Sequence, residues 1–369
     1  MHLLFAIAAS LLTVPAHGHA GHDVEREMAE RRQFLATHTN NLAHCESVHR
    51  ASGLEQRTVE RRLEMAKRLS GDENIMKRQT SSVNKSHKSD KSYNSATDPA
   101  VVFAGNRSCV LSPETTEGPF YVTGESIRTK LVDGEKGVPL HLDIQVIDVN
   151  TCKPLTGIFL EMWNANSTGV YSGALAIPNG SGMGDKGNLN KGFLRGAQST
   201  DKDGVAQFET IFPGHYTGRA THVHVITHHN AVAEANNTIW NSKVSHIGQA
   251  FFDQDLIDQV EKVAPYSTNR QSRMRNAVDS ILLQEAATAD PFFEYVLLGN
   301  TVADGIFAWF SFGVNTTYTR GIMPVAMAYK EGGKMATNNP KLPGFSQMFP
   351  GGFPTSFQPG FGPSPTPKV

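Results

Sequence analysis

Residues 219–225 carry the side chains best suited to metal chemistry, and they read R-A-T-H-V-H-V. His222 and His224 are two residues apart among β-branched residues. On a strand, such side chains point to the same face, roughly 6.5–7 Å apart. Two imidazole nitrogens at this spacing can bind one metal ion, because each metal–nitrogen bond is about 2.0–2.1 Å long. The pair alone is a weak signal, so other parts of the chain must supply the remaining ligands.

Two further stretches carry phenol side chains that a metal could bind. Residues 116–122 read T-E-G-P-F-Y-V and include Tyr121, and residues 163–171 read W-N-A-N-S-T-G-V-Y and end at Tyr171. Taken singly, each tyrosine is more often a packed aromatic residue than a ligand. Only a fold that brings both phenols to the histidine pair would give them a chemical role.

Short strands separated by turns are the elements that must position these residues. Residues 140–146 read L-H-L-D-I-Q-V, and this strict alternation is typical of a half-buried strand. The D-K-D-G sequence at 201–204 predicts a tight turn. Further strands are expected at residues 157–163, 205–211, 221–227, 249–252 and 305–314. Residues 253–263 predict one short helix with Asp253 as its N-cap. This pattern indicates an all-β fold, a β-sandwich core with short helices.

The chain ahead of this core has targeting and linker features. Residues 1–20 resemble a secretory signal peptide, because their apolar run is too short to span a bilayer. Residues 21–70 are charged, with apolar residues at helical spacing, and predict a helical segment. The dibasic pair Lys77-Arg78 is either a processing site that removes a pro-segment up to residue 78 or an ordinary exposed pair. Residues 71–99 have hardly any apolar residues and predict a flexible linker.

The remaining residues divide into one domain and a tail. Residues 100–335 are expected to form the β-sandwich domain, and residues 336–369, rich in Pro, Gly and Phe, a disordered tail. Cys109 and Cys152 could pair, which would leave Cys45 free or bridging to another chain. The chain contains N-x-S/T sequons, as expected for a secreted glycoprotein. They lie at Asn84, Asn106, Asn166, Asn179, Asn236 and Asn315.

The overall composition excludes several classes of partner. Of the 369 residues, 19% are charged and 39% hydrophobic, and the formal net charge is −1. Such a balance gives no general attraction to nucleic acid or to acidic lipid. No segment after the signal peptide approaches the length of a membrane span. We therefore expect a soluble, secreted protein without nucleic-acid or membrane partners, while the sequence leaves its oligomeric state open.

The motifs form a specific combination when they are taken in order. They read E-G-P-F-Y, W-N-A-N-x-x-G-x-Y, R-G-A-Q-S-T-D-x-D-G and P-G-H-Y-x-x-R-A-T-H-V-H. Over residues 108–314 the chain thus resembles the intradiol ring-cleaving dioxygenases, the family of catechol and protocatechuate dioxygenases. Within that family it looks like the secreted fungal relatives.

This resemblance implies a non-haem Fe(III) ion and a set of site residues. The implied ligands are Tyr121, Tyr171, His222 and His224. Tyr171 would be the axial tyrosinate that substrate displaces, and Tyr121 the equatorial one. The Arg219 guanidinium would lie over the substrate ring, and Gln249 would lie near the site. Hard phenolate oxygens fit this expectation, because they favour Fe(III) and a trivalent ion stabilises the phenolate form.

The implied reaction is cleavage of a catechol-type ring with O₂ to a muconate-type diacid. Tyr171 would take one hydroxyl proton of the catechol, and Arg219 would stabilise developing negative charge. One alternative is a non-catalytic secreted β-sandwich that binds aromatic or cell-wall material. Another is zinc or copper at the same site. Ligand-capable residues at every implied position favour the enzyme, and two phenols favour a hard trivalent ion.

Overall fold

The computed structural model describes residues 42–71, 120–176, 179–240, 243–244, 246–288, 290–322 and 324–336. The signal peptide, linker and tail expected from the sequence lie outside these residues, apart from residues 71 and 336. Cys109, the Lys77-Arg78 pair and the sequons at Asn84 and Asn106 also lie outside them.

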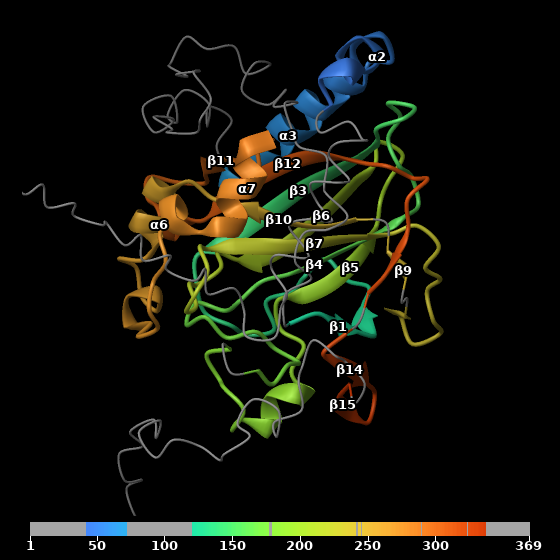
Figure 1. The fold of residues 1–369 in the computed structure, drawn as a ribbon. Coiled ribbons are helices and arrows are strands. Elements are labelled where there is room, and N and C mark those ends of the chain that lie inside the picture. Colours follow the sequence, from blue (N-terminus) through green and yellow to red (C-terminus); the bar gives the residue numbers. More distant parts are fainter. Residues whose placement is uncertain are drawn as a thin grey trace, which may run out of the picture.

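Two four-stranded sheets face each other and form a sandwich, which confirms the expected fold class (Figure 1). The first sheet is antiparallel, with the order β10 (His246–Phe251), β7 (His222–His228), β4 (Phe159–Trp163) and β5 (Arg195–Ser199). The second has the order β11 (Glu294–Leu297), β12 (Ile306–Val314), β3 (Pro139–Asp148) and β6 (Val205–Ile211). In the second sheet, β12 and β3 are parallel and the other neighbours are antiparallel.

The apolar core fills the space between the two sheets. Alternate residues of β3 and of β7 enter this core from opposite sides, for example Leu142 and Ile144 opposite Val223 and Val225. This alternation exposes the other face of β7, which carries His222, His224 and Ile226, to a second cluster on the outside of the first sheet. The histidine pair therefore lies outside the sandwich core, beneath loops.

The N-terminal helices cover the outer face of the second sheet, beside β12 and β3 (Figure 1). They are η1 (Ala43–Cys45), α2 (Glu46–Ala51) and α3 (Leu54–Ser70), so the helical prediction is confirmed where this segment is described. Arg61 and Arg62 of α3 bind Asp143 of β3, with Nε to carboxylate oxygen distances of 2.9 and 3.2 Å. The expectation of a half-buried strand at 140–146 is therefore wrong, because α3 buries its polar face as well.

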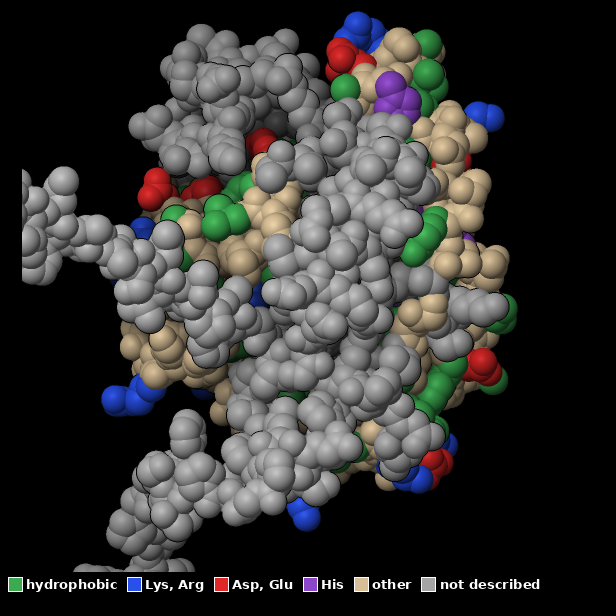
Figure 2. Space-filling model, viewed as in Figure 1, with side chains coloured by type: hydrophobic (Ala, Val, Ile, Leu, Met, Phe, Trp, Pro, Cys, Tyr) green, Lys and Arg blue, Asp and Glu red, His purple; other side chains and the backbone are tan. Residues whose placement is uncertain are grey.

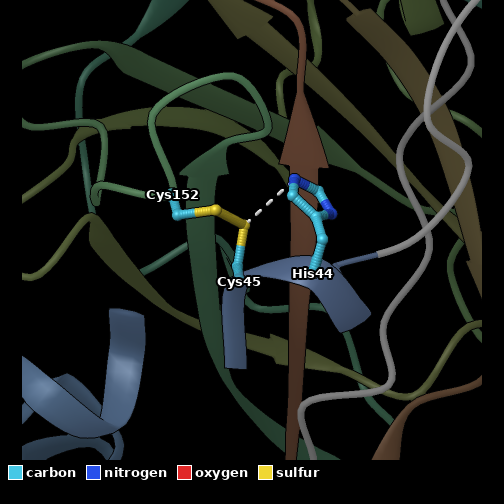
Figure 3. A group of neighbouring side chains, drawn as sticks. All are labelled: His44, Cys45 and Cys152. Carbon is cyan, nitrogen blue, oxygen red and sulfur yellow. Dashed lines mark hydrogen bonds between the residues drawn. A yellow bond between two sulfur atoms is a disulfide. The ribbon is translucent and has the colours of Figure 1, made fainter. Parts of the chain in front are cut away.

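A disulfide joins the N-terminal helices to the sandwich. Cys45 is bonded to Cys152, with Cα atoms 5.2 Å apart (Figure 3). The suggested pairing of Cys109 with Cys152 is therefore wrong. The two bonded cysteines are 107 residues apart, and they meet because α2 lies against the turn after β3. There His49 Nε2 donates to the Cys152 carbonyl at 3.1 Å and His44 Nε2 to the Val149 carbonyl at 2.8 Å.

Shorter elements complete the part of the chain that the structure describes. The predicted helix is present as α6 (Gln254–Val260), and the Asp253 carboxylate caps it by accepting from the Leu256 amide at 2.8 Å. The other helical elements are η2 (Lys186–Asn190), η3 (Tyr266–Thr268), η4 (Asn276–Val278), α7 (Ser280–Thr288) and η5 (Val302–Asp304). The remaining strands are β1 (Val122–Thr123), β2 (Glu125–Ser126), β8 (Thr238–Ile239), β9 (Lys243–Val244), β13 (Arg320–Gly321), β14 (Ala326–Tyr329) and β15 (Gly332–Met335).

Among the described residues, every helix is too short or too polar to cross a bilayer. Figure 2 shows acidic and basic side chains interspersed around the described rim of one face. This mixture agrees with the net charge of −1.

Candidate metal centre

Strand β7 brings the two imidazoles of the H-x-H pair together. His222 and His224 are 2% and 0% exposed, and their Nε2 atoms are 3.0 Å apart. Two nitrogen ligands at right angles, each ~2.1 Å from a metal, would be about 3 Å apart. The Nδ1–H of His222 donates to the Ala220 carbonyl at 2.6 Å. That bond fixes the tautomer of His222 and leaves the Nε2 lone pair directed toward His224.

Two phenols reach this histidine pair from separate loops. Tyr171 follows β4, and its hydroxyl is 3.4 Å from His222 Nε2. Tyr216 precedes β7, and its ring centroid is 5.7 Å from that of His222 and 5.3 Å from that of Tyr171. The Tyr171 and Tyr216 hydroxyls are hydrogen-bonded to each other. Two imidazoles and two phenols thus meet at one buried point.

Tyr216 is the site residue that the sequence reasoning missed. It is 3% exposed, and its hydroxyl also hydrogen-bonds Arg219. The signal was present in the P-G-H-Y motif, which lies directly ahead of R-A-T-H-V-H. Its proximity to the histidines along the chain could have drawn attention to it.

Tyr121, the other phenol expected at the metal, lies beside Trp163. Its ring lies 5.8 Å from the ring of Trp163, and Trp163 in turn stacks on His224 at 4.6 Å with an interplanar angle of 3°. Tyr121 is also buried, and its carbonyl accepts from the Val325 amide at 2.8 Å. Its role as a ligand stays a prediction, and the geometry favours Tyr216 as the second phenol at the imidazole pair.

Arg219 and Gln249 lie together beside the phenols, as the resemblance implied. The Arg219 Nη2 donates to Gln249 Oε1 at 2.6 Å, and its Nε donates to Asp279 Oδ2 at 2.9 Å. The same Asp279 oxygen accepts from the Ala220 amide at 2.7 Å. Asp279 was not expected from the sequence, because it lies 60 residues after Arg219 and in no recognisable motif. This carboxylate balances the buried guanidinium charge.

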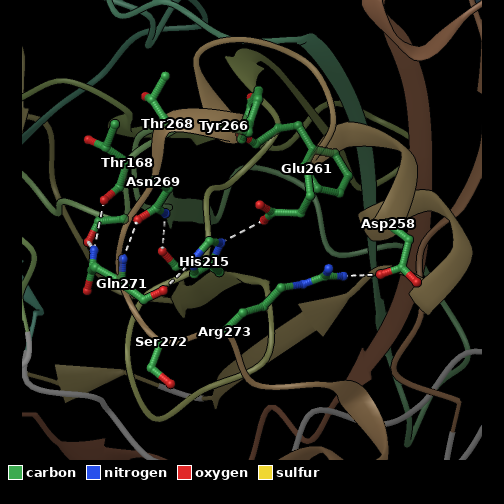
Figure 4. A network of polar contacts seen from close by, with 12 residues as sticks. Thr168, His215, Asp258, Glu261, Tyr266, Thr268, Asn269, Gln271, Ser272 and Arg273 are labelled. Carbon is green, nitrogen blue, oxygen red and sulfur yellow. Dashed lines mark hydrogen bonds and ion pairs between the residues drawn. The ribbon is translucent and has the colours of Figure 1, made fainter.

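A polar network holds the loop that carries Tyr216 and Arg219 (Figure 4). His215 Nδ1 lies 2.8 Å from Glu261 Oε1, and its Nε2 lies 3.0 Å from the Gln271 carbonyl. Asn269 Nδ2 donates to the His215 carbonyl at 2.8 Å. The loop before β7 is thereby tied to the segment after α6, which fixes the positions of the residues that follow His215.

Burial keeps the donor groups neutral. Burial and then the nearby Arg219 lower the pKa of His222 to about 3. Burial raises the pKa of both Tyr171 and Tyr216 above the usual range of a phenol. Neutral imidazoles have a free lone pair for a metal, and a cation would reverse the effect of burial on the phenols. Converging imidazole nitrogens and phenol oxygens fit a single hard, high-charge metal ion such as Fe(III).

Comparison with known proteins finds similarity to dioxygenases. A family model described as "Dioxygenase" matches residues 116–269. Catechol 1,2-dioxygenase 1 of Acinetobacter lwoffii is 33% identical over 110 residues, which are 28% of this chain and 32% of that protein. The chain therefore spans about a third of the length of this curated relative.

Two solved structures match over nearly their whole length. An intradiol ring-cleavage dioxygenase from Tetranychus urticae is 29% identical over 56% of this chain and 95% of that chain, with a TM-score of 0.45. A second dioxygenase crystal structure is 30% identical over the same shares, 56% and 95%, with a TM-score of 0.45. The chain is thus similar to dioxygenases, and the match to the family model covers residues 116–269.

Proposed function

We propose that this protein is a secreted non-haem Fe(III) dioxygenase that cleaves catechol-type rings with O₂ between the two hydroxylated carbons. The observation that carries the proposal is the convergence of two phenols on the imidazole pair, with His222 and His224 Nε2 atoms 3.0 Å apart and the Tyr171 hydroxyl at 3.4 Å. The residues that would hold the iron are Tyr171, Tyr216, His222 and His224, with Tyr121 as the alternative second phenol.

The residues of the chain can perform the proton transfers that the reaction needs. Bound ferric iron would supply a Lewis-acidic centre that keeps the phenols ionised and binds the two oxygens of a catechol. The Tyr171 oxygen would accept one hydroxyl proton of the substrate. The Tyr216 oxygen, which is hydrogen-bonded to that of Tyr171, would be the second phenolate ligand. Arg219, oriented by Asp279 and Gln249, would stabilise negative charge that develops on the substrate.

The test combines colour, iron content and oxygen uptake. We expect purified protein with one iron per chain to be red-brown, because phenolate-to-Fe(III) charge transfer absorbs visible light. An oxygen electrode should record uptake with at least one of catechol, protocatechuate, hydroxyquinol or caffeate, and the product should be a ring-opened diacid. An iron-replete but colourless preparation would rule out the proposal. Coloured protein that binds these phenols without consuming O₂ would favour the non-catalytic alternative.

The proposal that the protein is secreted rests on the N-terminal sequence and on the disulfide. We propose that residues 1–20 are a signal peptide, since disulfides such as Cys45–Cys152 persist in oxidising compartments. The proposed order continues with the helical segment, the linker, the domain at 100–335 and the tail. Mass analysis of protein from the culture medium should give an N-terminus after Gly18 or Ala20. Protein that retains Met1 and stays inside the cells would contradict this part.

A further inference from the structure

Tyr171 lies on the loop between β4 and β5, outside the strands that the structure describes. Its backbone groups are instead bound by the side chain of Asn179. The Tyr171 amide donates to Asn179 Oδ1 at 2.8 Å, and Asn179 Nδ2 donates to the Tyr171 carbonyl at 2.8 Å. One carboxamide thus satisfies both backbone groups, as a paired strand would do.

A second carboxamide binds the same carbonyl. Asn188 Nδ2 donates to the Tyr171 carbonyl at 2.8 Å and to the Ala174 carbonyl at 2.9 Å. Asn179 Nδ2 also donates to the Ala174 carbonyl, at 3.1 Å. Asn179 and Asn188 are 3% and 0% exposed, so these bonds are shielded from water. The backbone next to Tyr171 is held too, because Arg195 Nε donates to the Ser172 carbonyl at 2.9 Å.

We propose that Asn179 and Asn188 are positioning residues that hold the Tyr171 phenol beside His222, and that the sequon at Asn179 therefore carries no glycan in the folded protein. The first part rests on the proposed function, and the second part does not. Displacement of a reacting group by about 1 Å can cost two orders of magnitude in rate. The hydrogen bonds of these two carboxamides therefore matter for the placement of the phenol as well as for stability.

The prediction that Asn179 carries no glycan follows from the same hydrogen bonds. Asn179-Gly180-Ser181 is a sequon, and a glycan would be attached to Asn179 Nδ2. That nitrogen donates to two different carbonyls, at 2.8 and 3.1 Å, and the residue is 3% exposed. A sugar would replace one of these donors and has no space at a buried nitrogen. By contrast, Asn236 in Asn236-Asn237-Thr238 is exposed and can carry a glycan.

The positioning role is tested with Asn188→Leu in full-length, iron-loaded protein. Leucine has a similar size but cannot donate to the Tyr171 carbonyl. We expect the visible charge-transfer band to shift and the iron affinity to fall by about 10- to 100-fold, as for other residues that orient metal ligands. The value of kcat should fall by a similar factor with little change in KM. A variant with wild-type band, iron affinity and kcat would overturn the proposal.

The matched control is Asn164→Leu. Asn164 is equally buried, at 1% exposure, and its Nδ2 also donates to backbone carbonyls, those of Ala165 at 2.9 Å and Ile211 at 3.3 Å. It makes none of the bonds to Tyr171 described above. We expect this control to lower the melting temperature but to keep the wild-type band position. If both variants shift the band equally, the effect is general destabilisation and the positioning role is wrong.

Glycan mapping provides a test that does not depend on iron or on folding of a variant. Wild-type protein secreted from a eukaryotic host is deglycosylated in H₂¹⁸O, and its peptides are analysed by mass spectrometry. We expect the label at Asn236 and none at Asn179 in the soluble protein. Label at Asn179 in folded protein would overturn the proposal. Label at Asn236 without label at Asn179 is the result that supports the second part, and the Asn188→Leu band tests the positioning role separately. A wild-type protein that never binds iron would refute the proposed function but leave the prediction for Asn179 standing.

Discussion

Two tyrosines, Tyr121 and Tyr216, are candidates for the second phenol at the imidazole pair. Tyr121 and Tyr216 are both buried and both lie within reach of the aromatic cluster around the imidazoles. Tyr216 is hydrogen-bonded to the Tyr171 hydroxyl and to Arg219. The ring of Tyr121 lies beside the ring of Trp163. The roles of the two phenols can be distinguished by deleting one hydroxyl at a time, since Phe preserves the ring packing.

Tyr216→Phe is expected to remove or strongly shift the charge-transfer band, because it deletes one of the two phenolates that would hold the iron. It should lower kcat by at least about 10- to 100-fold, the cost of losing even an outer partner of a metal ligand. Tyr121→Phe is the matched control and should retain the band. Visible spectra and oxygen uptake of the iron-loaded variants provide the measurement. Loss of the band in Tyr121→Phe alone would restore Tyr121 as the second ligand.

A buried acid on the first sheet gives a prediction for pH. Burial, opposed by Arg195, raises the pKa of Glu161 to about 8. Its carboxyl lies 2.9 Å from His228 Nε2, and burial lowers the pKa of His228 to about 3. Both groups are therefore neutral near pH 7 and are joined by one hydrogen bond between the carboxyl and the imidazole nitrogen.

Between the unfolded and folded pKa of Glu161, from 4.5 to about 8, the unfolded chain loses a proton that the folded chain keeps. The unfolding free energy contributed by Glu161 therefore falls as pH rises through this window. Glu161→Gln retains a donor to His228 and removes the titration. Urea unfolding at pH 5 and pH 8 should show a smaller loss of stability in the variant than in the wild type. An equal or larger loss would contradict the assignment.

At the scale of elements, α3 belongs to the sandwich domain. Asp143 is fully buried and binds Arg61 and Arg62, while Arg62 Nη2 also donates to Ser311 Oγ at 2.8 Å. Met65 and Ala66 pack against Phe307 and Trp309 of β12. The helix therefore closes the second sheet, and its removal as a pro-segment would expose both a buried charge and apolar surface.

Asp143→Asn is expected to lower the unfolding free energy by about 3–5 kcal/mol, because it removes the buried carboxylate that is ion-paired with the buried Arg62. Arg50→Ala is the matched control. Its salt bridge to Glu46 has side chains 68% and 66% exposed, so its loss should change stability by less than ~1 kcal/mol. Chemical denaturation of both variants gives the comparison. Similar losses in the two variants would show that α3 does not depend on its buried ion pair.

For the whole molecule, the disulfide decides how the N-terminal segment stays attached. Cys45 and Cys152 are 107 residues apart, so the bond closes a long loop and removes much freedom from the unfolded chain. Such a bond typically contributes about 2–5 kcal/mol. It also means that a cut after Arg78 would not release residues 42–71 from the domain.

Limited proteolysis at Lys77-Arg78 with a dibasic-specific protease tests this arrangement. On a non-reducing gel the cut protein should migrate as one chain, and on a reducing gel as two. Peptide mapping without reductant should recover the Cys45 peptide linked to that of Cys152. Release of the N-terminal fragment without reductant would show that this disulfide is absent. Cys152→Ser is the control and should release the fragment only after denaturation, because the contacts of α3 remain.

The sequence by itself determined six of the eight strands of the two main sheets, all but β5 and β11. It also determined the N-cap at Asp253 and the pairing of His222 with His224, because these depend on neighbours within a few residues. It also led to Tyr171, Arg219 and Gln249, which the structure brings together at the histidine pair. Their roles in catalysis stay predictions until the variants are measured.

Only the tertiary structure decided which partners meet across long stretches of chain. It paired Cys45 with Cys152, placed Asp279 against Arg219 and brought Tyr216 to Tyr171. The packing of loops against one another sets these contacts. Side-chain periodicity cannot predict that packing, because it reports only which face of a strand a residue occupies. The local pattern therefore specified the two imidazoles, whereas the packing of separate loops selected the phenol and the carboxylate that complete the site.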